Sequence, residues 1–237
     1  MGKKDNLSFY TADMKMAELV QCDYRLLLLL PRFGMELGVG EDSISEQCKR
    51  HDVQPALFVM ICNIYSFANY RPTPQEVEAI DVEPLLLYLS RSHTYYMESQ
   101  FLPIEQCLKN IANHYAAPHG NVLMRFYAEY MQEVLNHFDY EEKTVFPYIR
   151  SLLTGKQLRH EYDIETFEKN HSNIDDKLSD LKNILIKYLP NIGMAAEQTE
   201  LLFKIFSLED DLSRHTFIED DVLIPLVRHI EVSSHDK

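Results

Sequence analysis

A histidine motif that occurs twice constrains this chain more than any other feature. Residues 137–147 read His-Phe-Asp-Tyr-Glu-Glu-Lys-Thr-Val-Phe-Pro, and residues 215–225 read His-Thr-Phe-Ile-Glu-Asp-Asp-Val-Leu-Ile-Pro. In each copy a glutamate follows the histidine by four positions and a proline follows it by ten. A shift of 78 positions relates the two copies, and the same shift relates His93 to His171. The C-terminal two-thirds of the chain is therefore interpreted as two half-repeats, each with a single histidine 44 residues before a His-x-x-x-Glu motif.

These shared spacings predict a metal site. On an α-helix, residues four apart lie on one face about one turn apart, so the imidazole and carboxylate of each motif can bind one metal ion or two adjacent ions. Unrelated histidines would have no reason to share both spacings. A mixed nitrogen and oxygen set suits a pair of iron or manganese ions better than a metal that prefers thiolates. The predicted ligands are His93, His137, Glu141, His171, His215 and Glu219.

Four long helical stretches are predicted to carry these ligands, at about 83–113, 119–151, 162–189 and 194–231. Pro118-His-Gly120, Thr154-Gly155 and Pro190-Asn-Ile-Gly193 supply the breaks between them. Connections this short favour antiparallel neighbours, so we expect an all-α fold with an up-down-up-down four-helix bundle. Pro147 and Pro225 lie about 15 Å beyond their histidines along a helix. We therefore expect any kink at these prolines to lie clear of the site.

The first 75 residues predict a small helical domain that precedes the bundle. Apolar residues recur with helical spacing from Met16 to Leu30, and Ser43 with Glu46 forms a capping-box pattern. A further helix is predicted from Pro55 to Asn69. Residues 70–82 contain two prolines and have the composition of a linker. We therefore place one domain at residues 1–75 and the other at residues 76–237.

Charge and cysteine content argue against several classes of protein. Lys and Arg number 23 against 37 Asp and Glu, which gives a formal net charge of −14. This acidity disfavours nucleic-acid or anionic-membrane binding, including by a helix-turn-helix in the N-terminal part. The four cysteines lack Cys-x-x-Cys spacing and predict free thiols in a reducing compartment. Because no apolar targeting segment is present at the N-terminus, we expect a cytoplasmic protein.

The pattern of His93, His137-x-x-x-Glu141-Glu142 with Phe146-Pro147, His171 and His215-x-x-x-Glu219 resembles the haemerythrin-like domain. The resemblance covers about residues 83–231 and is strongest to the subgroup that repairs iron centres. Residues 17–48 resemble the small helical domain that precedes the bundle in that subgroup. There a glycine loop carries adjacent cysteines, whereas this chain has Gly38-Val39, so thiol chemistry is not expected at this loop. Asp175 stands where haemerythrin itself has a further histidine, which favours the six-ligand subgroup over a five-histidine oxygen carrier.

The resemblance implies a non-haem centre of two iron ions, with the four histidines as terminal ligands and Glu141 and Glu219 as bridges. Glu142, Asp220 and Asp221 are predicted either to support the ligands or to lie at the surface. Three functions fit this ligand set. The first is iron handling or iron–sulfur cluster repair under oxidative or nitrosative stress, with iron–sulfur proteins as partners. The second is reversible binding of dioxygen or nitric oxide by a carrier or sensor, and the third is an enzyme such as a peroxidase-like protein or a nitric oxide reductase.

The apolar run Leu26 to Leu30 contains more apolar surface than three short helices readily bury. Large exposed apolar patches usually mark interfaces. We therefore expect part of this surface to pack on the bundle or on another copy of the chain, and the latter predicts a homodimer.

Overall fold

The structure is a computed structural model that describes residues 9–115, 117–155, 162–170, 175–188 and 193–235. Within these ranges the chain is helical and has no strand, apart from an isolated β-bridge between Lys15 and Ser43. The expected all-α fold is therefore confirmed. The contacts of the chain divide it into two compact units, one formed by Met1–Arg91 with Phe217–Lys237 and the other by Ser92–Thr216. None of the described helices is long and apolar enough to cross a membrane.

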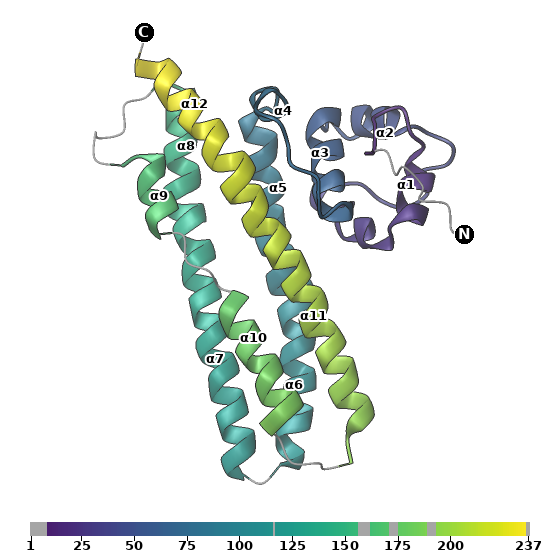
Figure 1. The fold of residues 1–237 in the computed structure, drawn as a ribbon, viewed down its shortest axis with the longest axis vertical. Coiled ribbons are helices and arrows are strands. Elements are labelled where there is room, and N and C mark those ends of the chain that lie inside the picture. Colours follow the sequence, from purple (N-terminus) through teal and green to yellow (C-terminus); the bar gives the residue numbers. More distant parts are fainter. Residues whose placement is uncertain (1–8, 116, 156–161, 171–174, 189–192, 236–237) are drawn as a thin grey trace. The chain divides into compact units, whose positions relative to one another are not determined.

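Four long helical stretches follow one another in the C-terminal part of the chain and lie side by side as a bundle (Figure 1). The first, second and fourth consist of α-helices interrupted by a π-helical turn. In the third, undescribed residues separate two α-helices, and the π-helical segment is the last described element; η3 to η6 denote the π-helical segments. The stretches are, in order, α5 (Val82–Tyr95), η3 (Tyr96–Phe101) and α6 (Leu102–His114); α7 (Ala117–Tyr140), η4 (Glu141–Val145) and α8 (Phe146–Leu153); α9 (Ile164–Asn170), α10 (Asp175–Asn183) and η5 (Ile184–Tyr188); and α11 (Ala195–Ile218), η6 (Glu219–Leu223) and α12 (Ile224–His235).

One apolar core within Ser92–Thr216 takes side chains from all four stretches. These residues recur at helical spacing, so each helix presents one apolar stripe to the others. Burying a side chain of this size contributes about 1.5–3 kcal/mol. Members that are at most 1% exposed include Leu108 and Ile111 from α6, Leu123 and Val134 from α7, Leu178 and Leu181 from α10, and Leu201 and Ile205 from α11.

The break between the first two stretches lies earlier than predicted. Pro118, His119 and Gly120 belong to the first turn of α7. Proline is tolerated there, because the N–H groups of the first helical turn have no acceptor within the helix. A Cβ atom on Gly120 would lie 2.4 Å from the carbonyl oxygen of Ala112 in α6. Gly120 therefore does not end a helix but allows α7 to approach α6 closely. The predicted break at Thr154-Gly155 is confirmed, with Gly155 in the left-handed region at φ +63°.

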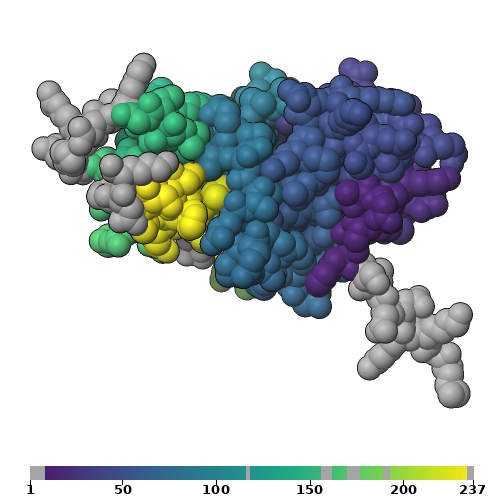
Figure 2. Space-filling model, turned by 90° about the horizontal axis from the view of Figure 1, so that it is seen from above, coloured from purple at the N-terminus to yellow at the C-terminus, as the bar shows by residue number. Residues whose placement is uncertain are grey.

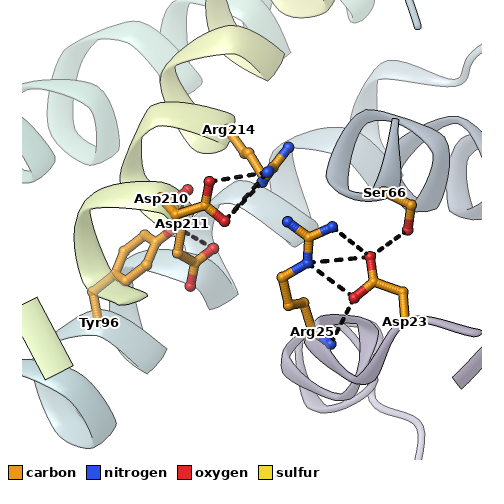
Figure 3. Close-up of polar contacts among 7 residues, drawn as sticks. All are labelled: Asp23, Arg25, Ser66, Tyr96, Asp210, Asp211 and Arg214. Atoms are coloured by element: carbon orange, nitrogen blue, oxygen red, sulfur yellow. Dashed lines mark hydrogen bonds and ion pairs between the residues drawn. The ribbon is translucent and has the colours of Figure 1, made fainter. Parts of the chain in front are cut away.

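The N-terminal helices are shorter than the apolar periodicity predicted. The extended backbone of Asp23 ends α1 (Met16–Cys22), and two short 3-10 helices follow, η1 (Tyr24–Leu28) and η2 (Pro31–Phe33). The Asp23 carboxylate accepts hydrogen bonds from the Arg25 backbone N–H at 3.0 Å, the Arg25 guanidinium at 2.9 Å and the Ser66 hydroxyl at 2.8 Å (Figure 3). One side chain thus caps η1 and ties it to the end of α3 (Pro55–Ser66).

Two capping boxes begin the remaining N-terminal helices, α2 (Ile44–Arg50) and α4 (Pro74–Glu78). The predicted box of Ser43 and Glu46 is confirmed. The second box, formed by Thr73 and Glu76, lies in the segment predicted as a linker, which therefore contains a capped helix. In the space-filling view the atoms of residues 9–80 form a continuous packed mass (Figure 2).

Two of the four free cysteines lie in the interior. Cys48 and Cys62 are fully buried, whereas Cys22 is exposed. Burial raises the pKa of the Cys48 thiol to about 12 and raises that of Cys62 well above its ordinary value. Since the thiolate is the reactive form, neither buried thiol is available for nucleophilic or redox chemistry near neutral pH.

We expect iodoacetamide at pH 8 to label Cys22 in the native protein while Cys48 and Cys62 stay unmodified until denaturant is added. Peptide mass spectrometry of native and denatured samples measures this difference. Labelling of Cys62 in the native protein at the rate of Cys22 would show that α3 opens readily and would contradict the described packing.

Candidate metal centre

Four of the predicted ligands converge in the interior. One ligand atom from each of His93, Glu141, His215 and Glu219 lies within 4.8 Å of the others. His93 belongs to α5 and Glu141 begins η4, while Glu219 begins η6 one turn after His215 on the same continuous helix. All four side chains are buried, and both carboxylates are 0% exposed. The helical spacing of four therefore directs each imidazole and its carboxylate inward together.

A fifth predicted ligand, His137, contacts this cluster. Its Nε2 atom lies 3.1 Å from Oε1 of Glu141, which follows His137 by one turn of the same helix. His137 is 9% exposed. His171, the sixth, lies outside the described residues. The structure thus places five predicted ligands together, and His171 stays a prediction.

The separations within the cluster match those between ligands of a metal ion. His93 Nε2 lies 3.2 Å from His215 Nε2 and 3.2 Å from Oε2 of Glu141. Two metal–nitrogen bonds of about 2.1 Å at right angles would place their nitrogens about 3.0 Å apart.

The chemistry of the donor set also fits a cation. Two ionised carboxylates in the interior cost several kcal/mol each in lost hydration unless nearby positive charge offsets that loss. Divalent cations bound by both carboxylates can supply that charge. No cysteine belongs to the cluster found among the described residues, and its nitrogen and oxygen donors suit iron or manganese.

Hydrogen bonding and packing orient the His93 ring. Its Nδ1 atom lies 2.9 Å from Oε1 of Glu142. The rings of Phe138 and Phe146 lie nearly parallel to it, with centroids at 4.2 Å and 5.9 Å and interplanar angles of 17° and 7°. When Nδ1–H donates to Glu142, the lone pair of Nε2 is left to face the cluster. Glu142, for which the sequence left two roles open, is therefore a partner of a ligand, whereas Asp220 and Asp221 are exposed.

Sequence reasoning missed Tyr96 and Asp211 beside His215. The Tyr96 hydroxyl donates to Oδ1 of Asp211 at 3.2 Å (Figure 3). The Tyr96 and His215 rings are T-shaped to each other, with a centroid distance of 5.5 Å. Tyr96 and Asp211 are buried, at 0% and 3% exposure. A signal was present, because Asp211 precedes His215 by four positions and so lies on the same helical face as His215 and Glu219.

The expectation that proline irregularities lie clear of the site was wrong. Glu141 and Glu219 are the first residues of the π turns η4 and η6. The N–H of Phe146 donates to the carbonyl of Glu141, and the N–H of Ile224 donates to that of Glu219, each spanning five residues. The expectation used the rise of a regular α-helix between His137 and Pro147. The segment between these two residues includes the π turn η4, so the helix there is not regular.

Comparison with known proteins agrees with this geometry. The family model for the Hemerythrin HHE cation binding domain matches residues 89–227, a range that includes every predicted ligand. The iron-sulfur cluster repair protein ScdA of Staphylococcus haemolyticus (strain JCSC1435) is 22% identical over 196 residues, an alignment that covers 81% of this chain and 87% of ScdA. No solved structure matches the chain significantly. Because the family match spans more than half of the sequence and coincides with a buried His and Glu cluster, this protein belongs to the hemerythrin HHE cation-binding family.

Proposed function

We propose that this protein binds two non-haem iron ions and handles iron under oxidative or nitrosative stress, with repair of iron–sulfur clusters as its role. The convergence of buried imidazoles and carboxylates supports iron binding. The repair role rests on the similarity to ScdA, whose name describes iron–sulfur cluster repair and most of whose length aligns with this chain.

The contacts of Glu141 support two ions rather than one. Its Oε1 atom faces Nε2 of His137 at 3.1 Å, and its Oε2 atom faces Nε2 of His93 at 3.2 Å. A carboxylate whose oxygens face different imidazoles is arranged to bridge two cations, each also bound by one of those histidines. The repeat predicts the same role for Glu219, with His215 on one side and His171 on the other.

When bound, a di-iron centre supplies reversible oxidation-state change and open coordination positions for a small ligand. The chain holds the ligands in place and limits water. Glu142 fixes the His93 ring, Tyr96 lies against His215, and the buried rings of Phe138 and Phe146 cover His93.

These apolar surroundings support a second candidate, reversible binding of dioxygen or nitric oxide by a carrier or sensor. An apolar lining favours small uncharged ligands over charged substrates. Anaerobic loading with ferrous iron, followed by exposure to air or nitric oxide, separates the candidates. Transfer of iron to an apo iron–sulfur protein supports repair, reversible gas binding without iron loss supports a carrier or sensor, and gas turnover supports an enzyme.

The protein purified after anaerobic loading with ferrous iron should contain about two iron ions per chain, because mixed nitrogen and carboxylate ligands of this number suit two cations. Elemental analysis with a protein assay measures the ratio. One ion per chain, or zinc alone after loading with iron, would contradict the di-iron proposal.

Replacing either predicted bridge should weaken metal binding more than replacing its neighbour. Glu141→Gln or Glu219→Gln removes a negative charge shared by both ions and should lower iron occupancy below half of the normal value. Glu142→Gln keeps an oxygen that can accept from His93 Nδ1, and should cost about tenfold in affinity, as is usual for partners of metal-bound histidines. Titration with ferrous iron under anaerobic conditions measures each affinity.

Glu129→Gln is the matched surface control, because Glu129 lies on the same helix, is exposed and pairs with the exposed Arg125 at 3.8 Å. This variant should bind iron as the natural protein does. If Glu142→Gln proved as damaging as Glu141→Gln, the assignment of the bridging carboxylate on α7–η4 would be wrong.

A further inference from the structure

The π turns of the bundle share a position relative to proline. Three π turns end two residues before a proline: η3 before Pro103, η4 before Pro147 and η6 before Pro225. Such turns are rare and occur often at functional sites. This recurrence points to proline as the common cause of the three turns.

Proline chemistry explains why the turn lies before the ring. Pro147 has no N–H to donate to the carbonyl of Lys143, four residues earlier, and its ring would collide with that carbonyl in a regular helix. The helix widens by one residue instead, so the N–H of Phe146 donates to Glu141. Pro225 stands in the same relation to Asp221, and there Ile224 donates to Glu219.

Two of these three turns begin at a predicted bridging carboxylate. Glu141 precedes Pro147 by six positions, and Glu219 precedes Pro225 by six. The hydrogen bond that defines each π turn therefore ends on the backbone of the glutamate itself. We infer that Pro147 and Pro225 are positioning residues that act on the metal centre by holding the π turns in which Glu141 and Glu219 stand, an inference that rests on the proposed iron binding.

The contacts of His93 show what the wider turn provides. Glu141 and its neighbour Glu142 both reach this imidazole, the first at Nε2 (3.2 Å) and the second at Nδ1 (2.9 Å). In a regular α-helix, successive side chains diverge by about 100° around the axis. A π turn reduces this angle, so one carboxylate can face the metal position while the next supports the far side of the same ligand.

If the two prolines serve the metal centre, replacing them should weaken metal binding without lowering stability. If they serve only the fold, replacing them should lower stability. A proline in a helix interior lowers stability, because it removes a hydrogen bond. If Pro147 and Pro225 serve the centre, replacing both by alanine should keep or raise the melting temperature of the metal-free protein. The same change should weaken metal binding, because an alanine at each position allows the regular helix to form again, which would move both carboxylates.

The test compares the full-length protein with the variants Pro147→Ala, Pro225→Ala and the double variant, using Fe²⁺ and Co²⁺ alone as probes. We expect the double variant to bind Fe²⁺ at least tenfold more weakly, with an altered visible absorption of bound Co²⁺ and an undiminished melting temperature. Pro55→Ala is the control, because Pro55 begins α3, a helix that carries neither a π turn nor a predicted ligand. Its affinity should stay within about twofold of the natural protein's, which is less than about 0.5 kcal/mol by the relation of about 1.4 kcal/mol per tenfold change.

Each other outcome overturns the inference. Unchanged Fe²⁺ affinity in the double variant would show that the prolines do not position the carboxylates. A double variant that unfolds or melts at a lower temperature would assign the prolines to the fold. An equal loss of affinity in Pro55→Ala would show an effect that is not transmitted through Glu141 and Glu219. Failure of the natural protein itself to bind two ions would instead overturn the proposed function.

Discussion

Two carboxylates without solvent exposure, Glu141 and Glu219, set the main physical constraint on this fold. Negative charge in an apolar interior is costly unless cations or hydrogen-bond donors offset it. The surrounding imidazoles direct nitrogen atoms at the same point, where a cation could bind. A cation bound at this site would therefore offset the charge of both buried carboxylates. Metal binding and folding stability should consequently be coupled, because the unfolded chain offers no such site.

Helices, and not loops, carry the predicted ligands that the structure describes. The spacing of four residues places His137 with Glu141 and His215 with Glu219, and the α5 helix supplies His93 from a separate stretch. Because the site is held by three helices, its geometry depends on how these helices pack. The rings of Phe138 and Phe146, which lie against His93, are part of this packing. The same residues thus contribute to the stability of the bundle and to the orientation of a ligand.

Sequence spacing was sufficient to predict the helical fold and to select residues that the structure brings together, because both follow from local periodicity. The role of Glu142 was not decided by spacing, since it depends on which ring of another helix lies within reach. Tyr96 and Asp211 were missed for the same reason, as their hydrogen bond joins two helices. The π turns were not predicted, because the sequence was interpreted with one uniform helical rise up to Pro147 and Pro225. Proline disturbs the helical turn that precedes it.

The glycine loop of the N-terminal part has no cysteine pair that could carry out thiol chemistry. Gly34, Gly38 and Gly40 all have positive φ, at 70°, 95° and 60°, a conformation that glycine adopts without strain. The shape of this loop therefore depends on its glycines and not on the cysteine pair found there in the subgroup that the sequence resembles. With Val39 after Gly38, and with the thiols of Cys48 and Cys62 buried, this part of the chain offers no reactive cysteine pair. Any iron chemistry must then arise from the imidazoles and carboxylates of the bundle, where the two π turns place Glu141 and Glu219.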